Sequence, residues 1–116
     1  MNTDEKNQNA LIICGFILIS AICVSPMILF GKTLVLRDTF FEFRFLYDFS
    51  RENIINGIIP LWNPYSNCGQ PFIANPQSAF FYPLNWIYAL LNFNQAYTLF
   101  IFIHLFMAGF FMHAFV

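Results

Sequence analysis

The chain has 116 residues and a formal net charge of −1; 59% of its residues are hydrophobic and only 9% are charged. Because soluble domains carry about 25% charged residues, this composition argues against an ordinary water-soluble domain and indicates an integral membrane protein. All five basic and six acidic residues lie between Asp4 and Glu52, and none follows. The balanced charge leaves no basic patch, so it excludes nucleic acid as a partner.

Residues 1–9 form a polar tail, and residues 10–31 are predicted to be the first transmembrane helix. Ala10–Phe30 has no charge and, at about 1.5 Å per residue, can cross a hydrocarbon core of about 30 Å. The acidic tail and the lack of a small-x-small site after the apolar run argue against a cleaved signal peptide. Pro26 is expected to kink this helix or to mark its last turn.

Residues 32–79 are predicted to form a long loop that begins with an amphipathic helix over residues 39–56, lying on the membrane surface. Asp38 is typical of a residue that precedes a helix, and Asn56-Gly57 is typical of a helix stop.

Charged residues along this helix are spaced for pairing. Arg44 and Asp48 are i,i+4 neighbours, which favours an ion pair. We expect Glu42 and Asp48 to be solvated or paired on the helix surface rather than catalytic.

A proline-rich segment, residues 58–83, holds five of the six prolines and no charge. Asn63-Pro64 and Asn75-Pro76 are turn starters, because an Asn side chain can bond the backbone two residues later. The prolines exclude a helix or a central strand. The segment is therefore predicted to be a rigid, aromatic-packed loop, and irregular loops of this length tend to be functional.

Two apolar helices complete the expected all-α membrane fold. Residues 80–93 are predicted to form the second apolar helix, with Pro83 at a favoured first-turn position. Residues 95–116 are predicted to form the third, a transmembrane helix in which Gly109 offers a close-packing face. Because the chain stops at Val116 without a polar cap, we expect it to be truncated.

The three cysteines, Cys14, Cys23 and Cys68, do not form a disulfide framework or a cysteine–histidine cluster with zinc spacing. They are predicted to be unpaired thiols. The cofactor is unknown from the residues alone, with a divalent metal ion as the candidate.

Several motifs together resemble the YfhO family of bacterial multi-pass membrane proteins, over about seventy per cent of the chain, from Leu36 onward. They are Asp38, Asn56-Gly57-x-x-Pro60-Leu-Trp-Asn-Pro-Tyr65, Gly69-Gln-Pro71, Ala74-Asn-Pro-Gln-Ser-Ala79, Phe81-Tyr-Pro83, His104-Leu and Ala108-Gly109. Cys68 stands where the resemblance would place a glycine more often.

This resemblance implies membership of the GT-C group of membrane glycosyltransferases, which use a sugar carried on a polyprenyl phosphate. It implies an N-terminus in the cytoplasm, an extracytoplasmic first loop and a plasma-membrane location, with membrane lipids and further transmembrane helices as partners. The count of basic residues weakly favours the opposite orientation. The 116 residues would be an N-terminal part, which we expect to be inactive alone.

By the same resemblance, Asp38 matches the acidic residue that is central to catalysis in the first extracytoplasmic loop. A carboxylate there could act as general base towards the acceptor hydroxyl, or hold a metal ion that offsets the leaving phosphate. Alternatively, Asp38 caps the surface helix, and the two roles can coexist. Arg37 could contact a phosphate, or serve as an ordinary interfacial or ion-pairing arginine.

The substrate-binding residues that we predict are Arg37, Trp62, Asn63, Tyr65 and Gln77. Trp62 and Tyr65 are also typical of aromatic anchors in the headgroup zone. His104, in the middle of the third helix, is either functional or a neutral residue that bonds between helices.

The alternative function is a non-enzymatic membrane protein, such as a flippase-like transporter or a scaffold component. A transporter should carry polar or broken-helix features inside its spans. Here these features lie between the apolar helices, which favours a surface-facing enzyme.

Overall fold

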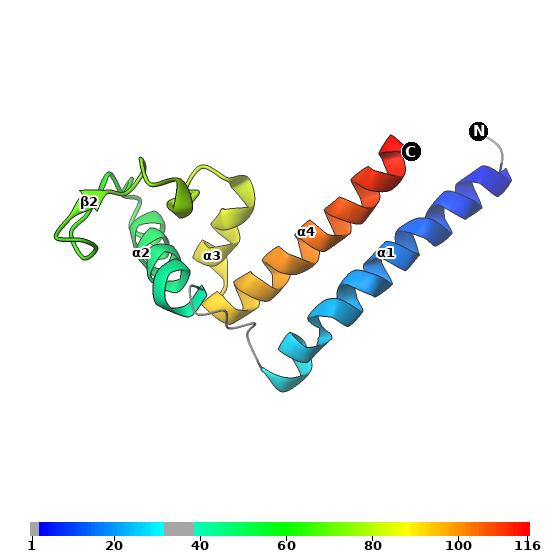
Figure 1. Ribbon diagram of the computed structural model, residues 1–116, viewed down its shortest axis with the longest axis horizontal. Coiled ribbons are helices and arrows are strands. Elements are labelled where there is room, and N and C mark those ends of the chain that lie inside the picture. Colours follow the sequence, from blue (N-terminus) through cyan, green and yellow to red (C-terminus); the bar gives the residue numbers. More distant parts are fainter. Residues whose placement is uncertain (1–2, 32–38) are drawn as a thin grey trace. The chain divides into compact units, whose positions relative to one another are not determined.

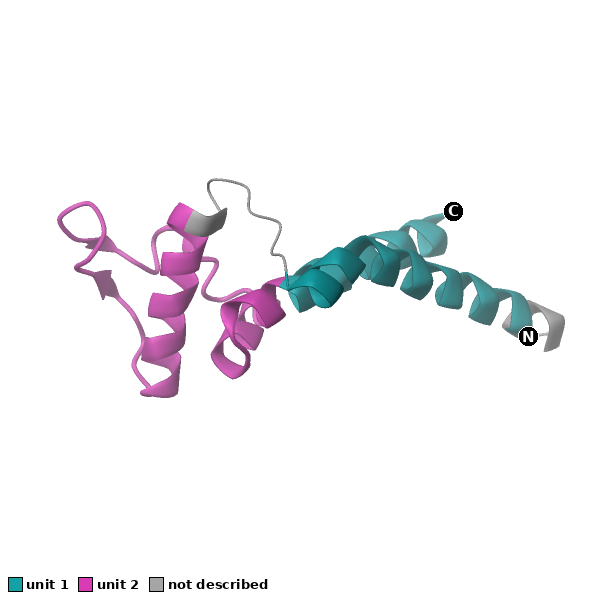
Figure 2. Cartoon of the chain, turned by 90° about the horizontal axis from the view of Figure 1, so that it is seen from below, with its two compact units in different colours: residues 1–32, 98–116 teal, residues 33–97 magenta. Residues whose placement is uncertain are grey.

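The structure is a computed structural model that describes residues 3–31 and 39–116 (Figure 1). The chain divides into two compact units (Figure 2). One unit comprises residues 1–32 and 98–116, and the other comprises residues 33–97. The candidate site lies in the second unit.

Helix α1 spans Thr3–Phe30 and therefore begins inside the predicted polar tail. Pro26 lies within the helix and does not end it. A proline has no amide to donate to the carbonyl four residues before it, here that of Ile22. The hydroxyl of Ser25 donates to this carbonyl at 2.7 Å and so replaces the missing bond.

Helix α4 spans Phe93–Phe115. It begins two residues before residue 95, the predicted start of the third apolar helix. The side chain of Asn92 accepts a hydrogen bond from the amide of Gln95 at 3.1 Å, which satisfies one of the free amides at the helix start.

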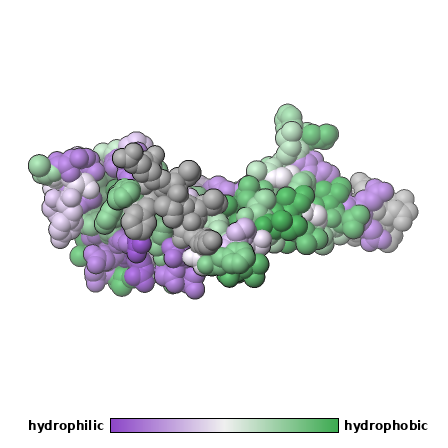
Figure 3. Space-filling model, turned by 60° about the horizontal axis from the view of Figure 1, so that its bottom comes forward, coloured by the Kyte–Doolittle hydropathy of each residue, from purple (hydrophilic) through white to green (hydrophobic). Residues whose placement is uncertain are grey.

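Two helices in the described part of the chain, Asn7–Phe30 within α1 and Phe93–Phe115, are long and apolar enough to cross a membrane. In Figure 3 the surface of the unit that contains most of these helices is largely hydrophobic, and hydrophilic residues gather over the other unit. Within the first unit, α1 runs alongside the C-terminal part of α4 (Figures 1 and 2).

Gly109 is the point of close approach between these two helices. A Cβ atom built on Gly109 would lie only 2.6 Å from a ring carbon of Phe16. The predicted close-packing role of Gly109 is therefore confirmed. The Phe16 ring also lies near His113, with ring centroids 6.4 Å apart.

The first described element of the second unit is a π-helical turn, η1 (Thr39–Phe43), that continues into helix α2 (Arg44–Ile55). The helix stop predicted at Asn56-Gly57 is confirmed. Gly57 has a φ of 68°, and its amide bonds the carbonyl of Ile54 at 3.0 Å. The amide of Ile58 bonds the carbonyl of Asn53 at 2.8 Å. This pair of bonds is the Schellman arrangement, which needs a left-handed residue after the helix.

The proline-rich segment contains a short antiparallel ladder, β1 (Trp62–Asn63) with β2 (Gln70–Pro71), in which Trp62 faces Pro71. The expectation of an all-α protein missed these strands. A ladder of this length tolerates Pro71, because a terminal or edge position does not require its amide. The segment then forms a single 3-10 turn, η2 (Pro76–Ser78).

Both Asn-Pro turns form as the sequence predicts. The side chain of Asn63 accepts a bond from the amide of Tyr65 at 2.9 Å. That of Asn75 accepts one from the amide of Gln77 at 3.0 Å. Each turn is thus fixed by the asparagine two residues before the bonded amide.

The tip of this ladder has three consecutive residues with positive φ: Asn67 at 51°, Cys68 at 60° and Gly69 at 105°. Only glycine adopts such angles without steric cost. Gly69 is also required by space, because a Cβ atom there would lie 2.8 Å from the ring of Trp62. Cys68, which is exposed and free, carries a side chain in a conformation that glycine would adopt without strain.

Replacing Cys68 with glycine is expected to stabilise the second unit by roughly 0.5–1 kcal/mol, because the left-handed conformation costs other residues about 1–2 kcal/mol and glycine's greater unfolded-state entropy offsets part of that gain. Both tryptophans, Trp62 and Trp86, lie in this unit, so the denaturation midpoint of their fluorescence measures its stability. Cys68→Ala removes the thiol but keeps the strain, and should leave the midpoint nearly unchanged. Equal midpoints for the two variants would contradict the explanation.

The predicted helix over residues 80–93 is wrong, because the helical stretch found there is shorter. The helical residues are η3 (Pro83–Trp86) and α3 (Ile87–Leu90), and Leu91 is extended. Ala79 has a φ of 41°, a left-handed conformation that changes the direction of the chain before Phe80. Pro83 does occupy the first turn, as predicted.

Side-chain bonds hold this irregular stretch in place. Trp86 donates its indole N–H to the carbonyl of Phe80 at 3.1 Å, and Asn85 donates its amide to the carbonyl of Ala79 at 2.9 Å. In a continuous helix, these two carbonyls would accept hydrogen bonds from backbone amides four residues later.

The core of the second unit consists of Leu46, Phe72 and Phe80, with Phe49 and Ile54 packed against it. Phe72 has no exposed surface. Phe72 and Phe80 of the chain after α2 therefore pack against Leu46, Phe49 and Ile54 on one side of that helix.

Helix α2 also contacts α3. The rings of Tyr47 and Tyr88 are stacked with centroids 4.1 Å apart and an angle of 5° between their planes. This contact packs α3 against α2.

Candidate functional site

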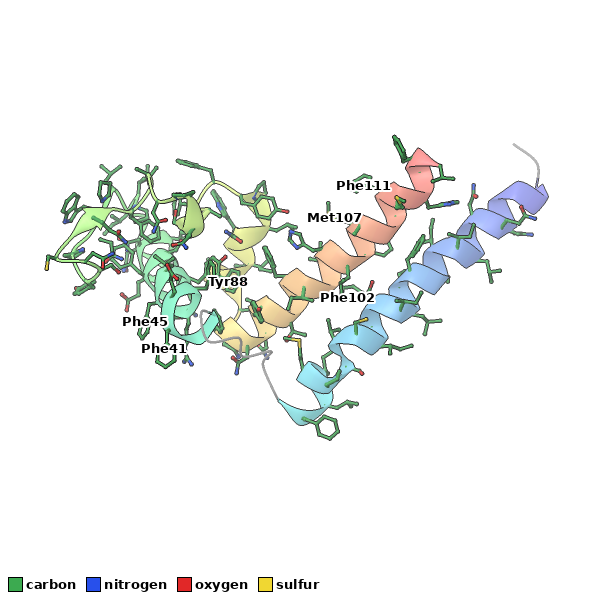
Figure 4. All side chains as sticks on the ribbon, viewed as in Figure 1. Phe41, Phe45, Tyr88, Phe102, Met107 and Phe111 are labelled. Carbon is green, nitrogen blue, oxygen red and sulfur yellow. The ribbon has the colours of Figure 1, made fainter. Side chains whose placement is uncertain are left out.

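A cleft of about 920 Å³ lies between one face of η1–α2 and the proline-rich segment. Its volume falls in the range of small-molecule sites, about 300–1,000 Å³. Because both walls belong to the second unit, the cleft is formed within that unit. Figure 4 shows Phe41 and Phe45, two of its lining residues, at the start of the helical wall.

The helical wall carries the acidic side chains. Glu42, Asp48 and Glu52 line the cleft and are all exposed. They share a face with the lining residues Phe45 and Phe49, because helix positions three or four apart are neighbours. This wall therefore offers carboxylates and aromatic rings side by side.

The loop wall carries amides. Asn67, Gln70, Asn75 and Gln77 line it together with Asn63. Asn63 is only 3% exposed, and its side chain is held by Tyr65 and by the hydroxyl of Ser66 at 3.3 Å. The turns that begin at the two Asn-Pro pairs thus position this wall.

The cleft brings together three of the predicted substrate-binding residues, Asn63, Tyr65 and Gln77. Tyr65 is 86% exposed and can therefore contact a ligand, and its ring also forms a T-shaped pair with the Phe49 ring, with centroids 6.1 Å apart. Trp62 does not line the cleft; its ring covers Gly69 and is 56% exposed.

The predicted catalytic residue, Asp38, and the predicted phosphate contact, Arg37, lie outside the described residues. In the sequence, Asp38 precedes the cleft residue Glu42 by four positions.

Arg44 is the basic residue that pairs with the acidic wall. Its Nε lies 3.6 Å from a carboxylate oxygen of Asp48, which confirms the predicted i,i+4 pair. Its guanidinium also lies over the ring of Phe93, 5.8 Å from the centroid. Both groups of the ion pair are about half exposed, so solvent screens their attraction.

Two tyrosines of the second unit that do not line the cleft, Tyr47 and Tyr88, have a raised pKa. Burial raises the pKa of Tyr47, and a side-chain hydrogen bond to Asn85 partly opposes this. Burial also raises the pKa of Tyr88, and Tyr47 and Tyr97 add to the effect. Both phenols therefore stay protonated near neutral pH, and neither can serve there as a general base.

Among the described residues, no group of three or more His, Cys, Asp or Glu side chains is placed to hold a metal ion. The described acidic residues of the cleft can therefore each contact a different part of a ligand. The predicted metal ligand, Asp38, is not among the described residues.

His104 bonds within its own helix, with Nδ1 2.7 Å from the carbonyl of Phe100. Its ring also lies against the Phe100 ring, with centroids 4.0 Å apart. These contacts give His104 a structural role in α4.

Sequence reasoning missed most of the polar lining. Glu42 and Asp48 were expected to be only surface or ion-pair residues, and Glu52 and the amides of Asn67 and Gln70 were not singled out. The spacing of residues 42, 45, 49 and 52 along one helical face was the available signal. The fact that this face is the one the loop covers is a property of the tertiary structure.

No protein-family model, curated protein or solved structure matches this chain. The motifs, the cleft and the two long apolar helices are therefore the features that bear on the function of this chain.

Proposed function

We propose that this chain is the N-terminal part of a multi-pass membrane glycosyltransferase that transfers a sugar from a polyprenyl-phosphate donor to a cell-envelope acceptor. The observation that carries the proposal is the cleft. It is lined by Asn63, Tyr65 and Gln77 of the motifs that resemble the YfhO family, facing a helix that bears carboxylates. Amides, carboxylates and aromatic rings are groups that can bind sugar hydroxyls and the apolar faces of sugar rings.

In the proposed reaction, Asp38 removes the proton of an acceptor hydroxyl as its oxygen attacks the anomeric carbon. The bond between that carbon and the phosphate oxygen breaks, and polyprenyl phosphate leaves with the electron pair. Attack from the face opposite the phosphate inverts the anomeric centre. Arg37 would stabilise the negative charge on the leaving phosphate.

The two helices of membrane-spanning length support a location in the plasma membrane. The proposed orientation has the N-terminus in the cytoplasm and the second unit outside. Among the described residues, the segments that interrupt regular helix lie between α1 and α4. This arrangement favours a surface site over a transport path, which would place broken helices within the spans.

Replacing Asp38 with asparagine is expected to reduce transfer about 100- to 10,000-fold, because the general base is lost. The assay uses the full reading frame that contains this segment and measures transfer from a labelled polyprenyl-phosphate sugar in isolated membranes. Asp4→Asn makes the same chemical change in the N-terminal tail and should retain activity.

Membrane insertion of each variant is measured by fractionation, so that loss of protein is separated from loss of chemistry. Unchanged transfer by Asp38→Asn would refute its role as the base. Absence of transfer by the unaltered full-length protein would refute the proposed function.

A further inference from the structure

The charged side chains on the described walls of the cleft are all acidic. Glu42, Asp48 and Glu52 line it, and none of the described lysine and arginine residues does. Arg44 offsets one of these charges from outside the lining, through its pair with Asp48 at 3.6 Å. Arg51, which is next to Glu52 in the chain, also lies outside the lining. An anionic group on a ligand in the cleft would therefore face carboxylates at close range and would be repelled.

The other components of the lining suit a polyhydroxylated ligand. The side chains of Asn67, Gln70 and Gln77 are each able to donate and accept hydrogen bonds. The rings of Phe45 and Tyr65 are exposed at the same cleft, and such rings can cover the apolar face of a sugar.

A metal ion does not explain the acidic wall. The described acidic residues do not converge into a group that could hold one ion. Their placement along about ten residues of helix, from Glu42 to Glu52, instead suits an extended ligand with more than one point of contact.

We propose that the cleft binds the acceptor of the transfer and that this acceptor is a glycan bearing free, protonated amines. The polyprenyl phosphate of the donor is excluded from the cleft by the same carboxylates. This inference rests on the proposed function, because it names the chemical class of the acceptor. It assigns Glu42 and Glu52 as specificity-determining residues for the amine.

The test measures binding of soluble oligosaccharides to the 116-residue chain in nanodiscs of phosphatidylcholine, a lipid without net charge. The probes are oligomers of glucosamine, glucose and galacturonic acid of equal length, titrated by calorimetry at about pH 6, where carboxylates are ionised and sugar amines are largely protonated. The glucosamine oligomer is expected to bind most tightly and to lose affinity as salt is added. The glucose oligomer should bind more weakly, and the galacturonic acid oligomer should not bind.

A double variant, Glu42→Gln with Glu52→Gln, is expected to weaken glucosamine-oligomer binding about five- to tenfold, as two exposed charge contacts together contribute about that factor. Asp48 is left unchanged so that Arg44 keeps its partner. The control is Asp4→Asn with Glu5→Gln, which alters net charge equally in the N-terminal tail and should not change the affinity.

Equal affinity for the three oligomers, tighter binding of the galacturonic acid oligomer, or no effect of the cleft variant would each overturn the inference. The binding assay requires no sugar transfer. A full-length enzyme that transfers sugar although its cleft shows no preference would therefore leave the proposed function standing. Amine-selective binding without any transfer would refute the proposed function and show a glycan-binding cleft alone.

Discussion

Replacing Phe72 with alanine is expected to destabilise the second unit by about 3–5 kcal/mol, a large part of the total stability of a typical domain. Phe72 has no exposed surface and is central to the core cluster with Leu46 and Phe80. Its ring also meets that of Phe49 edge-on, with centroids 5.0 Å apart. The smaller side chain would leave a cavity between the loop and α2. These two elements form the walls of the cleft.

The denaturation midpoint of tryptophan fluorescence is the measurement, because both tryptophans belong to this unit. Phe81→Ala is the matched control: Phe81 lies in the same segment but is 69% exposed, so its removal should cost far less. Similar losses for Phe72→Ala and Phe81→Ala would show that the buried core does not hold the loop on the helix.

Replacing Gly109 with leucine is expected to separate α1 from α4, at a cost of about 1–3 kcal/mol for the overpacked contact. Even one added carbon would lie 2.6 Å from the Phe16 ring. Small residues are favoured where helices meet in a membrane because they let the backbones approach closely.

The separation can be measured as a longer and broader distance distribution between two spin labels by pulsed dipolar resonance. One label is placed on Cys23 and the other on Met112→Cys, both exposed positions, with Cys14 and Cys68 replaced by alanine. Gly15→Leu is the control, because a Cβ atom on Gly15 meets nothing within 4 Å.

Adding Phe16→Ala to the Gly109→Leu variant should restore a narrow distribution, since the ring that clashes is then removed. Unchanged distances in Gly109→Leu would mean that the two helices do not depend on this contact.

Local features of this protein followed from the sequence because the interactions that form them span only a few residues. The turns at Asn63 and Asn75 close on amides two residues later. The helix stop at Asn56-Gly57 closes on carbonyls within the preceding turn. The long apolar helices also followed from composition, since an uninterrupted apolar run has few other structures available to it.

The second apolar helix illustrates where sequence reasoning failed. The apolar character of residues 80–93 predicted a continuous helix, yet Phe80 is buried with Phe72 and Leu46. Helical residues begin only at Pro83. Burial against residues distant in sequence outweighed the local preference of this segment for helix.

The two long apolar helices, the confinement of charge to the residues before Asn53 and the turns of the loop could all be read from the sequence. Which face of α2 the loop covers, and therefore which polar groups line the cleft, depends on long-range packing. Glu42 and Gln77, both in its lining, are far apart in the chain. They share one cleft because the buried aromatic core fixes the loop against the helix, a contact that no local pattern encodes.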